Sequence, residues 1–521
     1  MVRRKRFGRS VIIGLLWLVG GLAVLALALK LAFPLPDRGG IAKDGAAPDR
    51  PSALVRSVSA EAASHPGLAG VRLIPVGVDA FAARIAMVRA AQNTIDAQYY
   101  IWEDDLSGHL LLQALIEAAD RGVRVRLLID DNPTAGLDPM WRAIDSHPGI
   151  SVRLFNPLTI RAVRPLNYLF DFPRLNRRMH NKSLTVDGAV TLVGGRNVGD
   201  AYFGVKAENL FIDLDAVVIG SAVPEVSHLF ETYWQSPSAY PAGMILGPGS
   251  AYDLQRFRTK SHADPELERA FAAAAGNAIT AMDFGNAAGP VVWAPVRLVG
   301  DDPAKALGKA DRTGLLASQI APLIAGAHQR FDLVSGYFVP GTYGSDLLTG
   351  LARRGIPVRV VTNSIQVTDV PLVNAGYAPY RKPLLAAGVA LFEAKPQPRG
   401  DGSASETNLG RTSFSGGGES VHAKTFAIDG KSLFVGSFNF DPRSALLNCE
   451  MGLVIESADL AGAFSQALDQ RLPLSAYRLR LDRNDLVWED GARRYAQEPG
   501  TTAFQRGVLA VLSRLPVEWL L

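Results

Sequence analysis

"HNKSLTVDGAVTLVGG" at residues 180–195 and "HAKTFAIDGKSLFVGS" at residues 422–437 repeat one pattern in the two halves of the chain. In each copy a His is followed by a Lys two residues later, then by an Asp-Gly pair and a pair of small residues. An Asn stands two residues after each quoted stretch. The chain has eight histidines. Two of them at matched positions in a repeated pattern therefore indicate a paired chemical role.

The local pattern of each stretch is a strand, an Asp-Gly turn and a second strand, which predicts a β-hairpin. Side chains two residues apart on a strand point the same way. We therefore expect His180 and Lys182 to share a surface on the first strand of one hairpin, and His422 and Lys424 to do so in the other.

The remaining motif positions have different expected roles. Asp187 and Asp429 complete the pattern and are counted with the catalytic residues, yet their odd offset from the histidines favours a turn or salt-bridge role beside the Asp-Gly pair. The small residues let an anion approach the backbone, and the amides are donors for it. The candidate phosphate-binding residues are Gly195, Asn197, Ser437 and Asn439.

One half of such a site is chemically incomplete, whereas two halves facing each other across a pseudo-two-fold axis are complete. One imidazole can attack phosphorus and form a phosphohistidine, while the other protonates the leaving alcohol. The two lysines hold the charge on the non-bridging oxygens. Because these cations are built into the chain, we expect neither a metal ion nor another cofactor.

An imidazole nucleophile also needs a carboxylate on its far nitrogen. In the second half Glu450, on the predicted strand "CEMGLVI", is the natural candidate. In the first half Asp213 is placed similarly, with Glu208 and Asp215 as alternatives.

Upstream of each motif the chain repeats a strand–helix–strand order. "NTIDAQYYIW" and "QRFDLVSGYFV" precede the helical stretches "SGHLLLQALIEAADRG" and "SDLLTGLARRG", and a strand follows each helix. This order predicts parallel pairing in two similar α/β sandwich domains packed across a shared site. The expected divisions are a basic tail at 1–9, an anchor at 10–33, a linker at 34–66, a first domain at 67–245, an inter-domain region at 246–289, a second domain at 290–475 and a C-terminal extension at 476–521.

The two ends of the chain suggest contact with a membrane. Five basic residues in "MVRRKRFGRS" precede an uncharged stretch, Ser10–Leu29. As a helix this stretch would be about 30 Å long, enough to span a bilayer, although a cleaved signal peptide is the alternative. The basic residues should remain cytoplasmic, which puts the catalytic body on the other side. For the apolar C-terminus, an interfacial helix on the bilayer and a segment docked on the core are both open.

Composition adds limits of its own. The net charge of +4, from 54 basic and 50 acidic residues, does not by itself argue for a nucleic-acid partner. The single cysteine, Cys449, excludes an internal disulfide and lies in an apolar run, where a buried small residue is expected.

Both motifs match the HxKxxxxD…G(G/S)xN pattern of the phospholipase D, or HKD, superfamily. The chain further resembles the C-type branch of bacterial cardiolipin synthases in long stretches such as "DAQYYIWEDDLSG", "ADRGVRVRLLIDDN", "LVGGRNVGDAYFG" and the terminal "LPVEWLL". The resemblance implies His180 as the nucleophile and His422 as the acid and base. It also implies Lys182, Asn197, Lys424 and Asn439 as phosphate ligands.

The activity implied by the resemblance is transfer of a phosphatidyl group from a glycerophospholipid to phosphatidylglycerol at a bacterial inner membrane, with the body on the periplasmic side. The expected partners are phospholipid substrates and the membrane, without nucleic acid, and the need for an auxiliary protein is open. A hydrolytic phospholipase D or a nuclease that uses water as the acceptor is the alternative.

Overall fold

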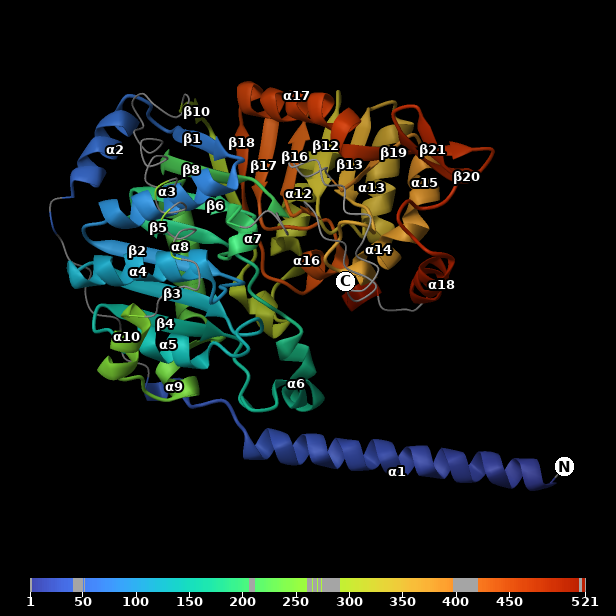
Figure 1. Cartoon of the computed structure of the whole chain (residues 1–521), viewed down its shortest axis with the longest axis horizontal. Helices are drawn as coiled ribbons and strands as arrows, with labels where there is room; N and C mark the ends of the chain where they lie inside the picture. The colour runs from blue at the N-terminus through green and yellow to red at the C-terminus, as the bar shows by residue number, and fades with distance from the viewer. Residues whose placement is uncertain are drawn as a thin grey trace.

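The structure is a computed structural model that describes residues 2–40, 50, 52–205, 211–259, 265, 269, 273, 291–396, 420–514 and 518–520. Two large β-sheets lie side by side, each covered by helices (Figure 1). In spatial order the first sheet contains β10 (Val292–Ala294), β1 (Ala69–Ile74), β8 (Asp215–Gly220), β6 (Val190–Gly194), β5 (Ser183–Val186), β2 (Thr94–Tyr99), β3 (Arg124–Asp130), β4 (Ile150–Phe155) and β9 (Ala239–Pro241).

The second sheet repeats this arrangement. Its order is β11 (Val296–Gly300), β18 (Met451–Glu456), β17 (Ser432–Gly436), β16 (Lys424–Ile428), β12 (Phe331–Ser335), β13 (Val358–Asn363), β14 (Ala390–Ala394), β19 (Ala476–Asp482), β20 (Asp485–Asp490) and β21 (Arg493–Tyr495). The run from β1 to β4 in the first sheet corresponds strand for strand to the run from β11 to β14 in the second. The expected internal repeat is therefore confirmed.

Helices surround both sheets. Those of the first half are α2 (Ala53–Ala63), α3 (Gly77–Ala90), α4 (Leu106–Asp120), α5 (Asp138–Asp145), α6 (Asn167–Leu175), α7 (Asp200–Phe203), α8 (Val223–Gln235), α9 (Ala242–Leu246) and α10 (Ala251–Arg258). Those of the second half are α12 (Leu316–Ala325), α13 (Gly341–Arg353), α14 (Pro371–Tyr377), α15 (Arg381–Ala386), α16 (Pro442–Leu446), α17 (Ala458–Ser475) and α18 (Ala503–Leu512).

The predicted strand–helix–strand units are present in both halves. β2 pairs in parallel with β3 across α4, and β12 pairs in parallel with β13 across α13. The same ion pair joins the strands in each half: Arg126 lies 2.7 Å from Asp96, and Arg359 lies 2.9 Å from Asp332. The repeat therefore extends from the topology to individual side-chain contacts.

Both predicted hairpins form at their Asp-Gly turns. β5 pairs with β6 and β16 with β17, in both cases antiparallel. The turn residues have positive φ, 50° and 60° at Asp187 and Gly188, and 56° and 61° at Asp429 and Gly430. Two consecutive positive φ angles define a type I′ turn, whose twist suits the flanking strands.

The histidines do not lie on these strands as expected. β5 begins at Ser183 and β16 at Lys424, so both histidines precede the first strand of their hairpin. The backbone around each histidine pairs with the opposite half of the chain, as described below, and this pairing takes it out of its own sheet.

The two sheets meet through β6 and β8 of the first and β17 and β18 of the second, which are neighbours in Figure 1. Small and branched apolar residues pack there and exclude water from the seam. They include Val193, Ala216 and Val218 on one side and Leu433, Val435 and Leu453 on the other.

The boundaries between the halves differ from those expected. β10 pairs with β1 of the first sheet, whereas β11 pairs with β18 of the second, so the chain crosses between the sheets at Pro295 and not at residue 290. The first half continues beyond residue 245, because α9 and α10 contact α5. The second sheet continues beyond residue 475 through β19–β21, and α18 contacts α14.

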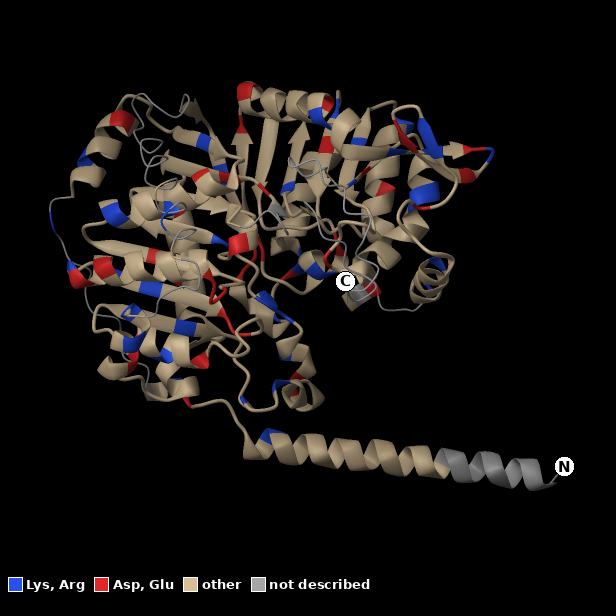
Figure 2. Cartoon of the chain, in the orientation of Figure 1, with Lys and Arg blue, Asp and Glu red and all other residues tan. Residues whose placement is uncertain are grey.

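The N-terminal helix α1 (Val2–Ala32) runs below the body in Figure 1 and contacts α6. Within the described chain one helix, Ile13–Ala32, is long and apolar enough to cross a membrane, and a signal sequence near an N-terminus has the same properties. Figure 2 shows this stretch without charge except at Lys30 near its end.

Candidate active site

Each motif histidine is held by backbone from the other half of the chain. The N–H of His180 donates to the carbonyl of Cys449 at 2.8 Å, and the N–H of Cys449 donates to the carbonyl of Arg178 at 2.8 Å. In the second motif, the N–H of His422 donates to the carbonyl of Ile212 at 2.8 Å. These contacts join the segments in front of both hairpins into one central cluster.

Each histidine also faces a carboxylate from the opposite half of the chain, so the pairs are crossed. Nδ1 of His180 lies 2.9 Å from Oε2 of Glu450, and Nδ1 of His422 lies 2.6 Å from Oδ2 of Asp213. The sequence identifies both acids but associates each with its own half. In the structure each acid contacts the histidine of the opposite half, so each histidine depends on both domains.

The alternatives to Asp213 have other positions. Asp215 is fully buried and pairs with Arg84 at 3.0 Å and with Arg196 at 3.3 Å. Its carboxylate is therefore committed to a structural ion-pair network. Glu208 lies outside the described residues.

Both motif lysines are almost completely buried, with exposed fractions of 1% for Lys182 and 2% for Lys424. The ammonium of Lys182 donates to the carbonyl of His180 at 2.6 Å, and that of Lys424 donates to the carbonyl of His422. Burial lowers the pKa of both ammonium groups, and the nearby acids Glu450 and Asp213 oppose this effect.

The pKa values show that the two halves act on each other electrostatically. Burial lowers the pKa of His180 to about 4, and both lysines contribute to the decrease while Glu450 opposes it. Burial likewise lowers the pKa of His422 to about 3, with Lys424 and Lys182 acting in the same direction and Asp213 opposing them. Because an ammonium of each half affects the histidine of the other, the four groups form one site.

At neutral pH both rings are therefore neutral and both acids are ionised. Burial alone would raise the pKa of Asp213, but the contact with His422 and the nearby cations lower it to about 2. The pKa of Glu450 is lowered in the same way by His180 and Lys182, against the effect of its burial. A neutral ring that faces a carboxylate through Nδ1 carries its proton there, which leaves the lone pair on Nε2 for chemistry.

Gly195 and Ser437 occupy equivalent positions in the two motifs but make different contacts. A Cβ atom at residue 195 would lie 2.1 Å from Oδ1 of Asp213, so the side chain of Asp213 fills the space that Ser437 fills in the other half. Ser437 donates its hydroxyl to Glu450 and accepts the N–H of Met451 at 3.0 Å. Ser437 therefore contacts the carboxylate that faces His180.

The two motif asparagines are not equivalent either. Asn197 accepts the N–H of Ile101 at 3.1 Å and donates to the hydroxyl of Tyr202 at 2.9 Å. Its amide therefore positions a tyrosine. Oδ1 of Asn439 is buried without a hydrogen-bond donor among the described residues.

Asp187 and Asp429 lie at the turns and do not belong with the catalytic residues. Asp187 accepts the N–H groups of Asn93 and Thr94 at 2.8 and 2.9 Å. Asp429 accepts the N–H groups of Gln329 and Arg330 at 2.7 and 3.0 Å. Each carboxylate caps the loop that enters the central strand of its own sheet, which is a structural role.

Three tyrosines beside the histidines were not identified from the sequence. The ring of Tyr100 lies 5.1 Å from that of His180, and the ring of Tyr202 lies 5.2 Å from that of His422. Tyr337 is 6.5 Å from His422 and donates its hydroxyl to Asp369 at 2.5 Å. Tyr100 and Tyr337 follow the strands β2 and β12, and only their place at the end of a repeated strand could have suggested them.

A buried network supports Glu450 from behind. Ser444 donates to its second carboxylate oxygen at 2.9 Å, and Asp301 accepts its backbone N–H at 2.9 Å. Lys305 in turn pairs with Asp301 at 2.8 Å.

Cys449, beside Glu450, is buried as expected. Among the described residues no group of three His, Cys, Asp or Glu side chains could hold a metal ion.

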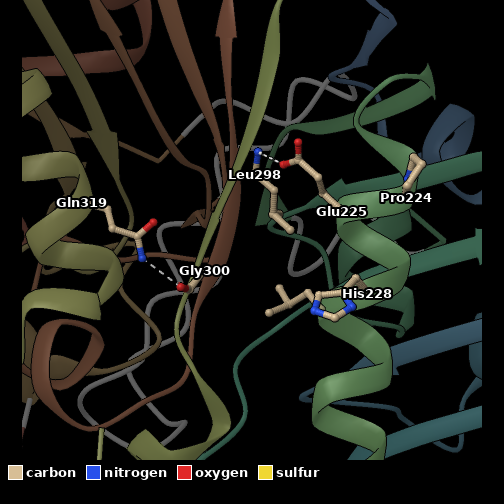
Figure 3. Close-up of a pocket in the computed structure, with 7 residues that line it drawn as sticks. Pro224, Glu225, His228, Leu298, Gly300 and Gln319 are labelled. Atoms are coloured by element: carbon tan, nitrogen blue, oxygen red, sulfur yellow. Dashed lines mark hydrogen bonds between the residues drawn. The ribbon is translucent and has the colours of Figure 1, made fainter. Parts of the chain in front are cut away.

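A pocket elsewhere on the seam between the halves contains none of these groups. Figure 3 shows it between α8, β11 and α12, where Glu225 accepts the N–H of Leu298 at 3.1 Å and Gln319 donates to the carbonyl of Gly300 at 3.0 Å. These side chains cover the outer edge of β11, which protects it from pairing with another chain.

Comparisons with known proteins agree with the geometry. Residues 85–234 and 320–472 match the family model described as cardiolipin synthase, PLD-like domain. The chain is 46% identical over 90% of its length to Cardiolipin synthase C of Escherichia coli K12, of which it covers 99%. It is 24% identical to a Cardiolipin synthase of Oceanobacillus iheyensis, over 79% of this chain and 70% of that protein.

Among solved structures, a phosphatidylserine synthase of Haemophilus influenzae Rd KW20 has a TM-score of 0.55 and 14% identity, with 90% of this chain and all of that chain covered. This likeness concerns the fold. The two matched regions contain both histidines, Lys182 and Lys424. The chain therefore belongs to the cardiolipin synthase family of proteins with phospholipase D-like domains.

Proposed function

We propose that this protein is a phosphatidyltransferase that moves a phosphatidyl group from a glycerophospholipid to the free hydroxyl of phosphatidylglycerol and so makes cardiolipin. The observation that carries the proposal is the identity of 46% over 90% of the chain to a protein named Cardiolipin synthase C. The crossed histidine–carboxylate pairs supply the chemistry that such a transfer requires.

In the first step Nε2 of His180 attacks phosphorus, and a P–N bond forms as the P–O bond to the leaving alcohol breaks. His422 gives the departing oxygen a proton. In the second step His422 takes the proton of the acceptor hydroxyl, the new P–O bond forms and His180 is released. The carboxylates of Glu450 and Asp213 hold the two rings and stabilise the positive charge that each ring acquires.

The low pKa of His422 bears on its role as the proton donor. A ring with a pKa of about 3 is almost entirely unprotonated at neutral pH, so it has no proton to give to the leaving oxygen. A bound phosphodiester brings a negative charge between the two lysines, which cancels part of their effect and raises the pKa of the ring. We therefore expect the acid form of His422 to appear only when substrate is bound.

For the location we propose the bacterial inner membrane, with the body on the periplasmic side. Support comes from α1, whose span Ile13–Ala32 follows Arg3, Arg4, Lys5 and Arg6. Positive residues beside a membrane helix tend to remain in the cytoplasm, so the residues after the helix would lie outside it. The partners are the phospholipid substrates and the membrane, and we expect no nucleic-acid partner.

A lipid assay tests this function directly. The purified full-length chain in mixed micelles with phosphatidylglycerol should make cardiolipin, with and without EDTA, and donor lipids with different labelled headgroups identify the source of the phosphatidyl group. Release of phosphatidic acid alone would show a phospholipase D, and cleavage of DNA would show a nuclease. Loss of activity in EDTA would contradict the proposal that the lysines supply the cations.

A further inference from the structure

An apolar stripe is exposed on the segment that precedes the first motif. The segment contains a 3₁₀ turn, Arg164–Leu166, followed by α6. Large apolar side chains recur at every third residue and remain exposed, with fractions of 51% for Val163, 40% for Leu166, 38% for Leu169 and 38% for Phe172. A cluster of exposed apolar side chains marks an interaction surface more often than a single one does.

The inner side of this segment is fixed by Asn167, which is 1% exposed. Its amide oxygen accepts the N–H groups of Thr159 and Ile160, each at 2.9 Å. Its amide nitrogen donates to the carbonyls of Ile160 and Arg164 at 2.8 and 2.9 Å. The stripe is thus presented by an ordered turn, so little conformational entropy is lost when a partner covers it.

Arginines anchor the same segment to the loop after β3. Arg161 donates to Asp138 at 2.9 Å and pairs with Asp131, and Arg164 donates to Thr134 at 2.9 Å. Residues 158–178 contain five arginines, but Arg174 also pairs with Asp171 and the buried Arg178 with Asp130, so most of their charge is neutralised within the body. These ion pairs hold the segment on the body, and the exposed apolar stripe is the part of it that is left for contact with lipid.

The stripe adjoins the helix that would span the membrane. α1 packs against α6, and Figure 1 shows α6 projecting from the body toward α1. Because α6 contacts α1, it lies beside the bilayer when α1 is inserted. This continuity identifies the bilayer surface as the partner that covers the stripe.

The segment also leads to the catalytic cluster. The hydroxyl of Tyr168 on α6 donates to Asn132, and the side chain of Asn132 is a hydrogen-bond partner of Tyr100. The ring of Tyr100 lies 5.1 Å from His180. We propose that residues 163–175 form a membrane lip that inserts its stripe among the lipid headgroups and brings a phospholipid to the His180 side of the site. The substrate route rests on the proposed function, whereas the insertion itself does not.

Spin labels in the full-length chain test the insertion. A label on Leu169→Cys, in vesicles of phosphatidylglycerol, should be more accessible to oxygen than to a water-soluble nickel reagent. Leu474→Cys is the matched control, because Leu474 is a 74% exposed leucine on α17, on the side of the molecule away from α6 (Figure 1). Its label should be more accessible to nickel. The native Cys449 is buried and should not react.

Equal access of nickel to both labels would overturn the proposal, and so would a label at 169 shielded from both reagents, which would indicate protein contact. Activity on vesicles gives a second test: Leu169→Asp should lower it about tenfold, and Leu474→Asp should leave it unchanged. Wild-type activity of Leu169→Asp would contradict the lip. A label at 169 in the bilayer of a chain that makes no cardiolipin would refute the function and leave the lip intact.

Discussion

At the scale of single residues, the two halves of the site are similar but not interchangeable. Asp213 uses the space that a side chain at residue 195 would need, and Ser437 in the other half donates to Glu450. The sequence shows the difference between Gly195 and Ser437 but not its reason, because the reason is a contact between residues distant along the chain.

Replacement of Gly195 by Ser should therefore disturb the site although the family pattern accepts either residue. The new Cβ would lie 2.1 Å from Oδ1 of Asp213 and would displace the acid from His422. We expect the kcat of Gly195→Ser to fall about a hundredfold, as it does when a catalytic ring loses its orientation. Ser437→Gly, which removes the hydrogen bonds of the hydroxyl to Glu450 and Met451 and leaves the carboxylate in place, should cost about tenfold in kcat. Normal kcat in Gly195→Ser would show that Asp213 is not needed.

The turn aspartates should affect stability and not catalysis. Burial alone would raise the pKa of Asp429. Three backbone N–H groups donate to its carboxylate and lower the pKa below its usual value. A lowered folded-state pKa stabilises the fold above the usual carboxyl pKa, and this contribution is lost as the pH falls through the folded-state value. Asp429→Asn should therefore lower the Tm at pH 7 by a few degrees.

Thermal unfolding at several pH values checks this prediction. The difference in Tm between Asp429→Asn and the wild type should shrink in acid, and the kcat of the folded variant should remain normal. A large loss of kcat with an unchanged Tm would return Asp429 to the catalytic group.

At the scale of elements, hairpins, strand–helix–strand units and the two-fold repeat could be predicted because short-range patterns determine them. The Asp-Gly turns and the period of the apolar residues are visible in the sequence. The segments in front of the strands could not be predicted in the same way. His180 and His422 leave their own sheets because Cys449 and Ile212 of the opposite half supply their hydrogen bonds.

The C-terminal segment makes contacts that its apolar sequence does not reveal. Arg443, on α16 after Asn439, donates to the carbonyl of Leu520 at 2.8 Å and to the side chain of Asn176 at 2.6 Å. It therefore connects the end of the chain to the strand-like segment that leads to His180. Glu518 beside it accepts the hydroxyl of Tyr380 at 2.7 Å.

Arg443→Ala should lower kcat about tenfold with little change in KM, because it loosens the segment in front of His180 without removing a lipid contact. Arg443→Lys should recover little of the loss, since an ammonium cannot reproduce a fork of donors to two partners. Steady-state measurement of kcat and KM for both variants tests this prediction. A change confined to KM would indicate a direct contact with lipid.

At the scale of the whole molecule, the candidate active site forms only where the two domains pack together. Glu450 holds the histidine of the first half, and Asp213 holds that of the second. The sequence named the two acids that face the histidines, but it assigned each to the wrong histidine, because a repeat does not show which copy a side chain reaches. The boundary at Pro295 could not be predicted either, because β10 pairs with β1, which is distant along the chain.

The crossed pairing predicts that a substitution in one domain impairs the step performed by the histidine of the other. Glu450→Gln should slow formation of the covalent intermediate on His180, whereas Asp213→Asn should slow both its formation and its transfer to the acceptor, because His422 acts in both steps. Rapid-quench single-turnover experiments separate the two rates. The opposite assignment, with Asp213→Asn slowing only formation of the intermediate, would contradict the proposed roles of the two rings.

The most direct measurement is to locate the covalent intermediate by mass spectrometry of the chain quenched during turnover with phosphatidylglycerol. We expect a phosphatidyl group on the peptide that contains His180. The group should be absent in His180→Ala and should accumulate in His422→Ala supplied with a donor whose headgroup departs easily. A phosphatidyl group on His422 would reverse the assignment. Turnover to cardiolipin without any covalent adduct would contradict the proposed phosphohistidine on His180.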